Sequence, residues 1–576
     1  MPAPKTPGLP EVVVGGSRVK LTQQMYVAAG GEAAIYKHNG RALRIYHDPK
    51  DMPPVDRLNE LSRVTPKNVV RPIDVITDAK SGQALGFSMD FVTGTEPLCR
   101  FFTAAFKKAN NITPVISGDL VVDIQKTVAQ LIAEGFLPVD LNEMNILPSL
   151  QDFTPYFIDI ASWATPSFPA TAIMDNVRDP MVQGNAFTAG STWYSFGVIA
   201  TQLYLGIHPF HGMHPVHKMD WKKRMALNAS IFEAGVRVPP VVPSFAVIPK
   251  AHLDWLKKVF ADSKFRDAPP LPGAVVPIPV VPAATRVINA TGNFTVDHWI
   301  KLPQDVVDVC TNFGNTYVVT TERVYWVVGN TITPIFDRSK YRQVFITPLD
   351  AGAVVLTAVG GGKVSFWHYT HAGGKTALIE EAPLTSGYFA RNQRLYSCVG
   401  TQLLEHEFMN LGAKVLHTTS HIDNVNDLTA RFFDGVVYQD LFGKAWLTVP
   451  FQAGATISKA ILQLDGYRVI DAKMVGQICA VIGEKNGDFV QFIIAFDATF
   501  NTYKVREVKD QRELNFTVTP NGICVMLVGD KLELFKDPFS AKVVDNPPVD
   551  ASTRLLMTPA GVHFIDGNEV QKLSVR

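Results

Sequence analysis

A proline-rich segment divides this chain into two parts with different sequence patterns. The segment Asp267–Ala284 repeats proline among short apolar residues and shows the period of neither a helix nor a strand. Such a composition is typical of an extended, semi-stiff linker. The chain has 576 residues, which is more than one hydrophobic core supports, so separate folding units are expected on either side. We therefore interpret residues 266–285 as a linker.

The part after the linker, residues 286–576, consists of short β-type runs separated by Gly, Asn and Asp turns, for example Tyr317–Thr320, Ala353–Val359 and Phe489–Phe496. Four-stranded units of about 40–45 residues each would give a β-propeller of six or seven blades. No W-D or kelch signature marks the repeats, so a large β-sandwich array is the alternative. Either way we expect an all-β domain that binds protein partners.

The overall composition excludes several classes of protein. A net charge of +1 and a hydrophobic content of 47% indicate neither a nucleic-acid partner nor a membrane partner. The five cysteines are scattered without a C-x-x-C pair, which fits a reducing compartment and argues against a zinc site. The first residues lack the apolar core of a signal peptide. We expect a cytoplasmic protein; its oligomeric state is left open.

The part before the linker begins with a Pro/Gly-rich stretch, residues 1–20, which we interpret as a flexible arm. Strand-like runs follow from Met25 to Tyr46, and Asn39-Gly40 between two of them predicts a hairpin turn. A glycine pair, Gly30-Gly31, lies in the preceding connection. Residues 21–265 would then form the first folded domain.

Three polar residues in this domain have the spacing that phosphoryl transfer requires. Asp140 is followed five residues later by Asn145, and Asp159 comes after the apolar run Tyr156–Ile158. A carboxylate can accept the proton of an attacking hydroxyl, and two further oxygen ligands can hold Mg²⁺ against phosphates. A helical pattern over Asp119–Glu134 directly precedes the group.

These motifs resemble the protein kinase superfamily, and in particular a divergent bacterial and phage kinase-like group. Asp140-Leu141 with Asn145 is similar to the D-L-x-x-x-N half of the kinase catalytic loop. The stretch Ser191–Phe210 resembles the core helix of the larger kinase lobe and the G-x-x-P-F sequence after it. The resemblance implies an α+β bilobal fold with an N-lobe over residues 21–92 and a C-lobe over residues 93–265.

The resemblance also implies ATP and Mg²⁺ as cofactors and a role for each matching residue. Asp140 would be the catalytic base with Asn142 beside it in the catalytic loop, and Asn145 and Asp159 would hold the metal. Nucleotide contacts would come from the glycine-rich connection, the third strand, the following helix and the hinge, namely Gly30, Gly31, Ile35, Arg44, Glu60, Met89, Asp90 and Val92. Glu60 would pair with Arg44.

Several positions depart from the kinase pattern. Arg44 and Asn142 both stand where the family has lysine, and Arg and Lys are not interchangeable at such a position. The loss of the second lysine removes a cation from the transferred phosphate. Pro138-Val139 replaces the H-R before the base, no A-P-E is visible, and Thr192 replaces the Asp that starts the core helix.

Three functions follow from these observations. The first is an ATP/Mg²⁺-dependent Ser/Thr-type kinase whose β-domain selects the protein substrate. The second is a catalytically impaired pseudokinase that acts as an interaction scaffold, for which a phage particle is one setting. A small-molecule kinase is the third. A separate cluster, His208, His211, His214 and His217, is interrupted by prolines and is interpreted as a solvated loop instead of a metal site.

Overall fold

The computed structural model describes residues 10–171, 173–218, 220–239, 241–272, 294–384, 387–412 and 414–575. The chain divides into two compact units. The first comprises Met1–Phe102, Pro114–Pro279 and Asp440–Gly443, and the second comprises Thr103–Thr113, Val280–Gln439 and Lys444–Arg576. No helix among the described residues is both long enough and apolar enough to span a membrane.

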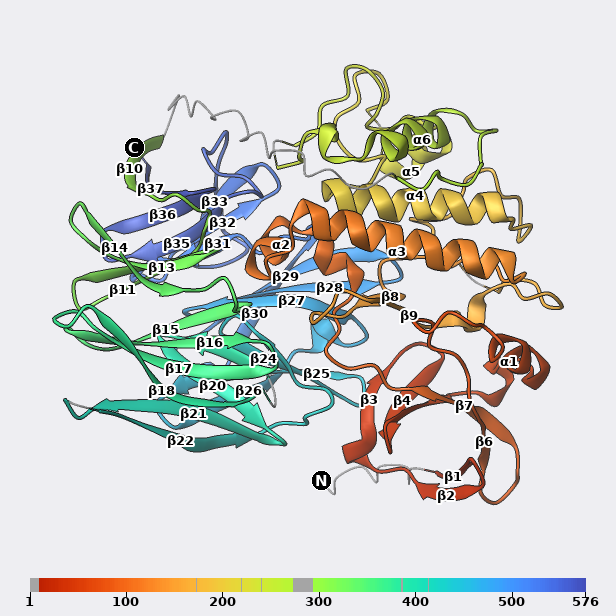
Figure 1. Cartoon of the computed structure of the whole chain (residues 1–576), viewed down its shortest axis with the longest axis horizontal. Coiled ribbons are helices and arrows are strands. Elements are labelled where there is room, and N and C mark those ends of the chain that lie inside the picture. Colours follow the sequence, from red (N-terminus) through yellow and green to blue (C-terminus); the bar gives the residue numbers. More distant parts are fainter. Residues whose placement is uncertain are drawn as a thin grey trace. The chain divides into compact units, whose positions relative to one another are not determined.

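The first unit begins with a seven-stranded sheet in the order β2-β1-β6-β7-β5-β4-β3 (Figure 1). Its strands are β1 (Glu11–Val14), β2 (Ser17–Lys20), β3 (Tyr26–Ala29), β4 (Ala33–His38), β5 (Arg41–Tyr46), β6 (Val75–Asp78) and β7 (Ala84–Asp90). The β4–β5 hairpin turns at Asn39 and Gly40, whose φ angles are 46° and 76°, as the Asn-Gly pair predicts. Tyr26, Leu43 and Ile76 belong to the core on the sheet.

The flexible arm predicted for residues 1–20 is wrong for its second half. Strands β1 and β2 form a hairpin, and β1 also pairs with β6. Val12 is fully buried, so the apolar run Glu11–Val14 contributes to the core, and Gly15 and Gly16 supply the positive φ angles of the turn. The first nine residues of the arm lie outside the described residues.

Most of the regular elements in the remainder of the first unit are helices. They are α1 (Val55–Leu61), α3 (Pro114–Ala133), α4 (Ala189–Leu205), α5 (Trp221–Ala226) and α6 (Lys250–Ala261), with a short hairpin of β8 (Ile146–Pro148) and β9 (Pro155–Phe157). Helix α4 is buried almost throughout and packs against α3 and α6 (Figure 1). Thr188 and Ser191 form a capping box at its start, and Gly206 ends it in the left-handed conformation.

The predicted linker begins later than residue 266. The indole of Trp255 donates to the carbonyl of Asp267, and Gln125 Nε2 donates to the carbonyls of Pro269 and Pro270. Because these bonds fix the backbone up to Pro270, the start of the proline-rich segment belongs to the helical part of the first unit. Residues 273–293, which include the rest of the predicted linker, lie outside the described residues.

The second unit contains a seven-bladed β-propeller, so the all-β prediction is confirmed and the blade count is the higher of the two predicted. Six blades are consecutive four-stranded antiparallel sheets, β11–β14 through β31–β34. In the seventh, β10 (Phe294–Lys301) pairs with β37 (Glu569–Val575). The first strand of the propeller therefore joins the last strand and closes the ring. Helix α2 (Ala104–Ala109) is also part of this unit.

The strand bounds of the blades are as follows. They are β11 (Val306–Asn312), β12 (Asn315–Thr320), β13 (Arg323–Val328), β14 (Thr331–Asp337), β15 (Gln343–Asp350), β16 (Ala353–Gly360), β17 (Lys363–Thr370), β18 (Lys375–Pro383), β19 (Tyr388–Arg391), β20 (Arg394–Val399), β21 (Gln402–Asn410), β22 (Val415–Asn424), β23 (Arg431–Phe433), β24 (Val436–Leu441), β25 (Lys444–Gln452), β26 (Ala455–Ala460), β27 (Arg468–Val475), β28 (Ile478–Lys485), β29 (Asp488–Phe496), β30 (Tyr503–Lys509), β31 (Phe516–Val518), β32 (Cys524–Val528), β33 (Lys531–Phe535), β34 (Lys542–Val544), β35 (Arg554–Thr558) and β36 (Gly561–Asp566).

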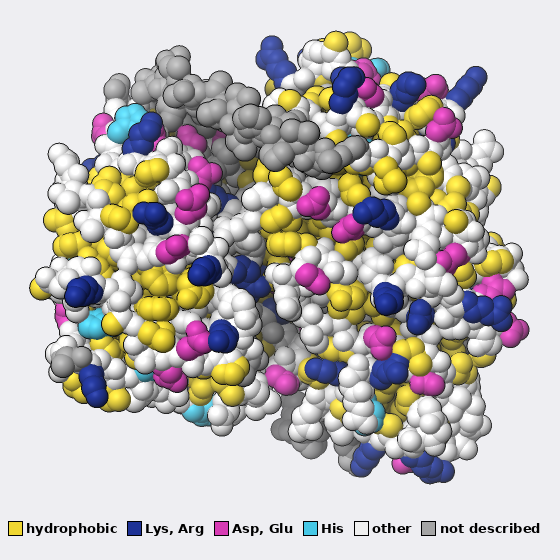
Figure 2. Space-filling model, viewed as in Figure 1, with side chains coloured by type: hydrophobic (Ala, Val, Ile, Leu, Met, Phe, Trp, Pro, Cys, Tyr) yellow, Lys and Arg dark blue, Asp and Glu magenta, His cyan; other side chains and the backbone are white. Residues whose placement is uncertain are grey.

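Charged side chains of both signs are mixed over the described surface in Figure 2, with apolar side chains between them. The arrangement agrees with a net charge of +1. Where opposite charges alternate, the field at the surface is weak, so long-range electrostatic steering of a charged partner is expected to be small.

Candidate functional site

The β8–β9 hairpin brings together the residues that the spacing analysis selected. Asn145 directly precedes β8 and Asp159 follows β9 by two residues, so the antiparallel pairing of the two strands places them at the same end of the hairpin. The amide of Ile158 donates to the carbonyl of Asn145 at 2.9 Å and continues the pairing to this end. Two positions separated by fourteen residues in sequence therefore become neighbours.

Asp140 is surrounded by hydrogen-bond donors. Its Oδ1 accepts from Asn142 Nδ2 and from the backbone amide of Met174, both at 2.9 Å, and its Oδ2 accepts from Asn145 Nδ2 at 2.9 Å. Burial nevertheless raises the pKa of the Asp140 carboxyl above its usual value, and the charge of Asp159 acts in the same direction. The predicted base is thus linked directly to the predicted metal ligand Asn145.

Asn142 has a structural task in this loop. Its side chain is fully buried, and its Oδ1 accepts from the backbone amides of Met144 (2.8 Å) and Asn145 (3.1 Å). Its amide nitrogen meanwhile donates to Asp140. A lysine could not accept these two backbone bonds, so the asparagine here holds the loop in shape in addition to holding the carboxylate of Asp140.

Arg44 and Asp159 form the ion pair that connects the sheet to the β8–β9 hairpin. Arg44 Nη1 donates to Asp159 Oδ1, and Arg44 Nη2 lies 3.7 Å from the carboxylate of Glu32. Burial opposes the charge on Arg44, but the carboxylates of Asp159 and Glu32 outweigh it, so the pKa of Arg44 is raised. Ile35 lies opposite Arg44 in the β4–β5 register, so these two predicted residues are also brought together.

The predicted pairing of Glu60 with Arg44 is wrong in this structure. Glu60 lies near the end of α1 and accepts from the backbone amide of Ser167 at 3.2 Å. Hydrogen bonds from the side chains of Ser167 and Thr165 hold the pKa of Glu60 below its usual value. Arg44 is instead neutralised by Asp159 and Glu32.

The glycine-rich connection between β3 and β4 is a tight turn fixed at its base. The amide of Gly30 donates to the carbonyl of Ala33 at 2.8 Å, and His47 contacts the carbonyls of Gly30 and Glu32. A Cβ atom added at Gly31 would meet no atom within 4 Å, so the tip of the turn is open. Gly30 and Gly31 therefore end the sheet near the Arg44 side chain.

The three predicted hinge residues lie at the end of β7 and just beyond it. Met89 pairs with Ala42 of β5 and packs against the cluster that contains Phe87 and Ala161. Asp90 forms an ion pair with Arg41 at 3.4 Å, and Val92 follows two residues later. Because Ala161 belongs to the same cluster, Met89 shares a hydrophobic core with the segment that begins at Asp159.

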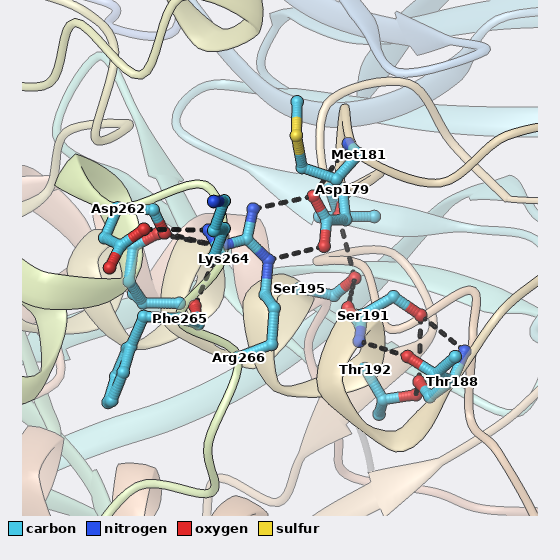
Figure 3. Close-up of polar contacts among 12 residues, drawn as sticks. Asp179, Met181, Thr188, Ser191, Thr192, Ser195, Asp262, Lys264, Phe265 and Arg266 are labelled. Atoms are coloured by element: carbon cyan, nitrogen blue, oxygen red, sulfur yellow. Dashed lines mark hydrogen bonds and ion pairs between the residues drawn. The ribbon is translucent and has the colours of Figure 1, made fainter.

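Sequence reasoning missed a second, buried ion pair, which Figure 3 shows. Arg266 Nε and Nη2 donate to the two oxygens of Asp179 at 2.6 and 2.9 Å. Nearby, Ser195 Oγ donates to the carbonyl of Val177 at 2.7 Å. These bonds attach the segment before α4 both to helix α4 and to Arg266, which follows helix α6. No local signal could have revealed the pair, because its members are 87 residues apart.

The side chain of Thr192 forms its hydrogen bond within its own helix, not with the catalytic-loop residues. Its hydroxyl donates back to the carbonyl of Thr188 at 3.3 Å, within the first turn of α4 (Figure 3). The side chain is completely buried. The position where the kinase pattern has Asp therefore serves the helix start here.

The histidine cluster was predicted to be a solvated loop, and this is wrong for two of its four members. His208 and His214 are buried. His208 Nε2 lies 2.9 Å from the carbonyl of Asn176, and His214 Nε2 lies 3.0 Å from the carboxylate of Glu233. Among the described residues, no group of three or more His, Cys, Asp or Glu side chains is arranged to hold a metal ion.

Comparison with known proteins adds little to this geometry. No family model matches the chain, and no curated protein matches it in sequence. Among solved structures, the chain is similar to the kinase PK-1 of the Cydia pomonella granulovirus, with 13% sequence identity and a TM-score of 0.32 over 42% of this chain and 89% of that chain. A likeness of that size identifies neither the family nor the activity of this chain.

Proposed function

We propose that the first unit is a bilobal, protein-kinase-like domain that binds ATP with Mg²⁺ and transfers a phosphoryl group to a Ser or Thr hydroxyl. The observation that carries the proposal is the grouping of Asp140, Asn145 and Asp159 at one end of the β8–β9 hairpin, with Arg44 bound to Asp159. Phosphoryl transfer requires mainly positioning and charge stabilisation, and these groups can supply both.

The residues present fit a magnesium ion. Mg²⁺ prefers oxygen ligands, usually one or two carboxylates together with phosphates and water. Asp159 keeps 42% of its side chain exposed, and the hydrogen bond from Arg44 engages its Oδ1. Asn145 donates through its amide nitrogen to Asp140, which turns its amide oxygen away from that carboxylate. Bound Mg²⁺ would neutralise charge on the phosphates, and Asp159 and Asn145 would hold it.

Asp140 fits the role of general base. Its pKa is raised by burial, which brings the carboxylate closer to the affinity for protons that a base needs near neutral pH. Asn142 and Asn145 fix its orientation through hydrogen bonds to its two oxygens.

Two observations favour a second candidate, a pseudokinase scaffold. The amide of Met174 already occupies Asp140 Oδ1. Glu60 is bonded to Ser167 and leaves Arg44 to Asp159 and Glu32. In this alternative the domain keeps the fold and presents a binding surface without turnover. For either candidate we propose that the propeller binds the protein partner, as propeller domains often do.

The test is thermal unfolding of the full chain with and without saturating Mg-ATP, for the wild type and for Asp159→Asn. Ligand bound only by the native state must stabilise it, by about 2.7 kcal/mol at a hundredfold excess over Kd. We expect Mg-ATP to raise the unfolding temperature of the wild type in a magnesium-dependent way and to leave that of the variant unchanged. A radiolabelled transfer assay on a generic protein substrate then separates kinase from pseudokinase. If saturating nucleotide leaves the unfolding temperature of the wild type unchanged, the proposal of nucleotide binding is overturned.

A further inference from the structure

Glu32 lies at the tip of the glycine-rich turn and faces the one guanidinium of the candidate site. Its carboxylate is 3.7 Å from Arg44 Nη2, whereas Asp159 pairs with the other terminal nitrogen, Nη1. The two side chains differ strongly in exposure: Glu32 is 68% exposed, whereas Arg44 is 12% exposed. A largely solvated carboxylate therefore lies beside a largely buried cation.

The backbone of the turn is anchored while the side chain of Glu32 is not. The amide of His47 donates to the carbonyl of Glu32 at 2.8 Å, and His47 Nε2 lies 3.0 Å from the carbonyl of Gly30. The 3.7 Å separation from Arg44 is longer than a hydrogen bond. Glu32 can therefore leave Arg44 by side-chain rotation alone, with the turn unchanged.

Arg44 has capacity for another acceptor. Its Nε is buried and has no hydrogen-bond partner among the described residues. A guanidinium has five N–H donors in a planar fork that suits phosphate oxygens. An oxygen-rich anion that entered beneath the turn would thus meet an unsatisfied donor as well as the group that Glu32 now contacts.

The charges at the site are unbalanced towards the negative. Asp159 and Glu32 both neutralise Arg44, and the charge of Asp159 also acts on Asp140. Around Arg44 and Asp140 the three carboxylates outnumber the cation that they contact, and the more distant effect of the buried Arg57, which acts with Arg44 on Tyr46, offsets only part of this excess. A metal-free nucleotide triphosphate would be repelled by this excess, whereas its complex with a divalent cation brings compensating charge.

We propose that Glu32 is a specificity-determining gate, which covers Arg44 when no ligand is bound and admits a nucleotide only as its divalent-cation complex. The gate rests on the proposed nucleotide binding and assigns a selectivity to it. Glu32 excludes the metal-free anion by repulsion and by competition for Arg44. The divalent-cation complex displaces it, because the cation offsets the repulsion and the phosphates bind the guanidinium.

The gate is tested by calorimetric titration of the full chain with ATP, in EDTA and in excess Mg²⁺. The variant is Glu32→Gln, and the matched control is Glu11→Gln, which removes an exposed glutamate paired with Arg18 at 3.8 Å on the first hairpin of the same sheet. We expect Glu32→Gln to bind metal-free ATP about tenfold more tightly than the wild type. Glu11→Gln should match the wild type. Equal affinity of Glu32→Gln and the wild type for metal-free ATP would overturn the gate.

A second readout needs no nucleotide and separates the gate from the proposed function. Phenylglyoxal modifies accessible arginines, and peptide mass spectrometry measures the rate at Arg44 in all three proteins. Release of the cover should raise this rate several-fold in Glu32→Gln and leave it unchanged in Glu11→Gln. If no protein binds ATP, the proposed function fails, and this rate still decides whether Glu32 covers Arg44. An unchanged rate in Glu32→Gln would overturn the cover.

Discussion

Two aspartate–arginine pairs in the first unit have the same chemistry and opposite environments. Asp179 and Arg266 are buried, with 3% and 14% of their side chains exposed, and meet through two hydrogen bonds. Asp159 is 42% exposed and meets Arg44 through one described bond. The first pair is thus shielded from water on nearly every side, whereas the second is open on the side of its carboxylate.

The two arginines also differ in how far their donors are used. The remaining nitrogen of Arg266 donates to the carbonyls of Asp262 and Phe265, both labelled in Figure 3. It also donates to the carbonyl of Val259, and the guanidinium lies 4.8 Å from the ring centroid of Tyr194. Arg44 keeps one buried nitrogen, Nε, that has no hydrogen-bond partner in the described part of the chain. A saturated pair can only hold structure, whereas an unsaturated and exposed pair can exchange partners. The comparison therefore separates the buried Asp179–Arg266 pair, here called the clasp, from the Asp159–Arg44 pair of the proposed nucleotide site, without reference to any family.

The largest expected effect is the loss of stability when the clasp, the Asp179–Arg266 pair, is broken. Arg266→Ala would leave the carboxylate of Asp179 buried without its partner, and breaking a buried pair on one side costs about 3–5 kcal/mol. Urea unfolding of the full chain, followed by hydrogen exchange in α4, measures the loss. Arg18→Ala in the exposed pair with Glu11 is the control and should cost less than about 1 kcal/mol. Equal losses of unfolding free energy in Arg266→Ala and Arg18→Ala would contradict the distinction between the buried and the exposed pair.

A smaller effect is expected at the bond beside the clasp. Ser195→Ala removes the completely buried hydroxyl that donates to the carbonyl of Val177, and an unsatisfied buried carbonyl costs about 1–3 kcal/mol. Thr201→Val is the matched control, because its hydroxyl donates to the carbonyl of Gly197 within its own helix. Unfolding free energies of both variants measure the difference. A loss in the control as large as that in Ser195→Ala would show that the bond to Val177 adds no stability.

The sequence predicted what local patterns determine. Asn39-Gly40 predicted the β4–β5 turn because only a few residues adopt its backbone angles. The spacing from Asp140 to Asn145 predicted their neighbourhood because both lie in one loop, and the short β8–β9 hairpin brought in Asp159. The β-rich pattern predicted the propeller but left six or seven blades open.

What the sequence did not predict depends on contacts between distant segments. The partner of Asp179 lies 87 residues away, and the partner of Glu60 lies 107 residues away, so no periodicity could indicate either. The blade count is fixed by β10 pairing with β37, the two ends of the propeller sequence. The first hairpin was taken for an arm because its Pro/Gly-rich flank outweighed the apolar run Glu11–Val14.

The exposed pair predicts a separation of stability from ligand response. Asp159→Asn should reduce the free energy of unfolding by no more than about 1 kcal/mol, because water and salt already screen a pair that is 42% exposed on one side. The same variant should lose the stabilisation by Mg-ATP, since it removes the carboxylate that we propose as a metal ligand. Unfolding of the ligand-free variant at low and high salt measures the first effect. A loss of unfolding free energy close to that of Arg266→Ala would show that Asp159 has a structural role like that of Asp179.

The smallest expected effect concerns Glu60, an exposed carboxylate that bonds Ser167 and Thr165 instead of an arginine. Its pKa lies below the ordinary value of 4.5 in the folded state, so its contribution to stability is present above that value and is lost as the pH falls through the lowered pKa. Glu60→Gln keeps an oxygen that can accept from Ser167, so the variant should be only slightly less stable at pH 7 and indistinguishable from the wild type in acid. The difference in unfolding free energy between the two proteins, measured at pH 7 and below the lowered pKa, cancels the titration of all other carboxyls. A difference at pH 7 as large as that of Ser195→Ala would mean that the contact between α1 and residues 165–167 is a structural contact comparable to the clasp. The comparison would then have to include it beside the two ion pairs.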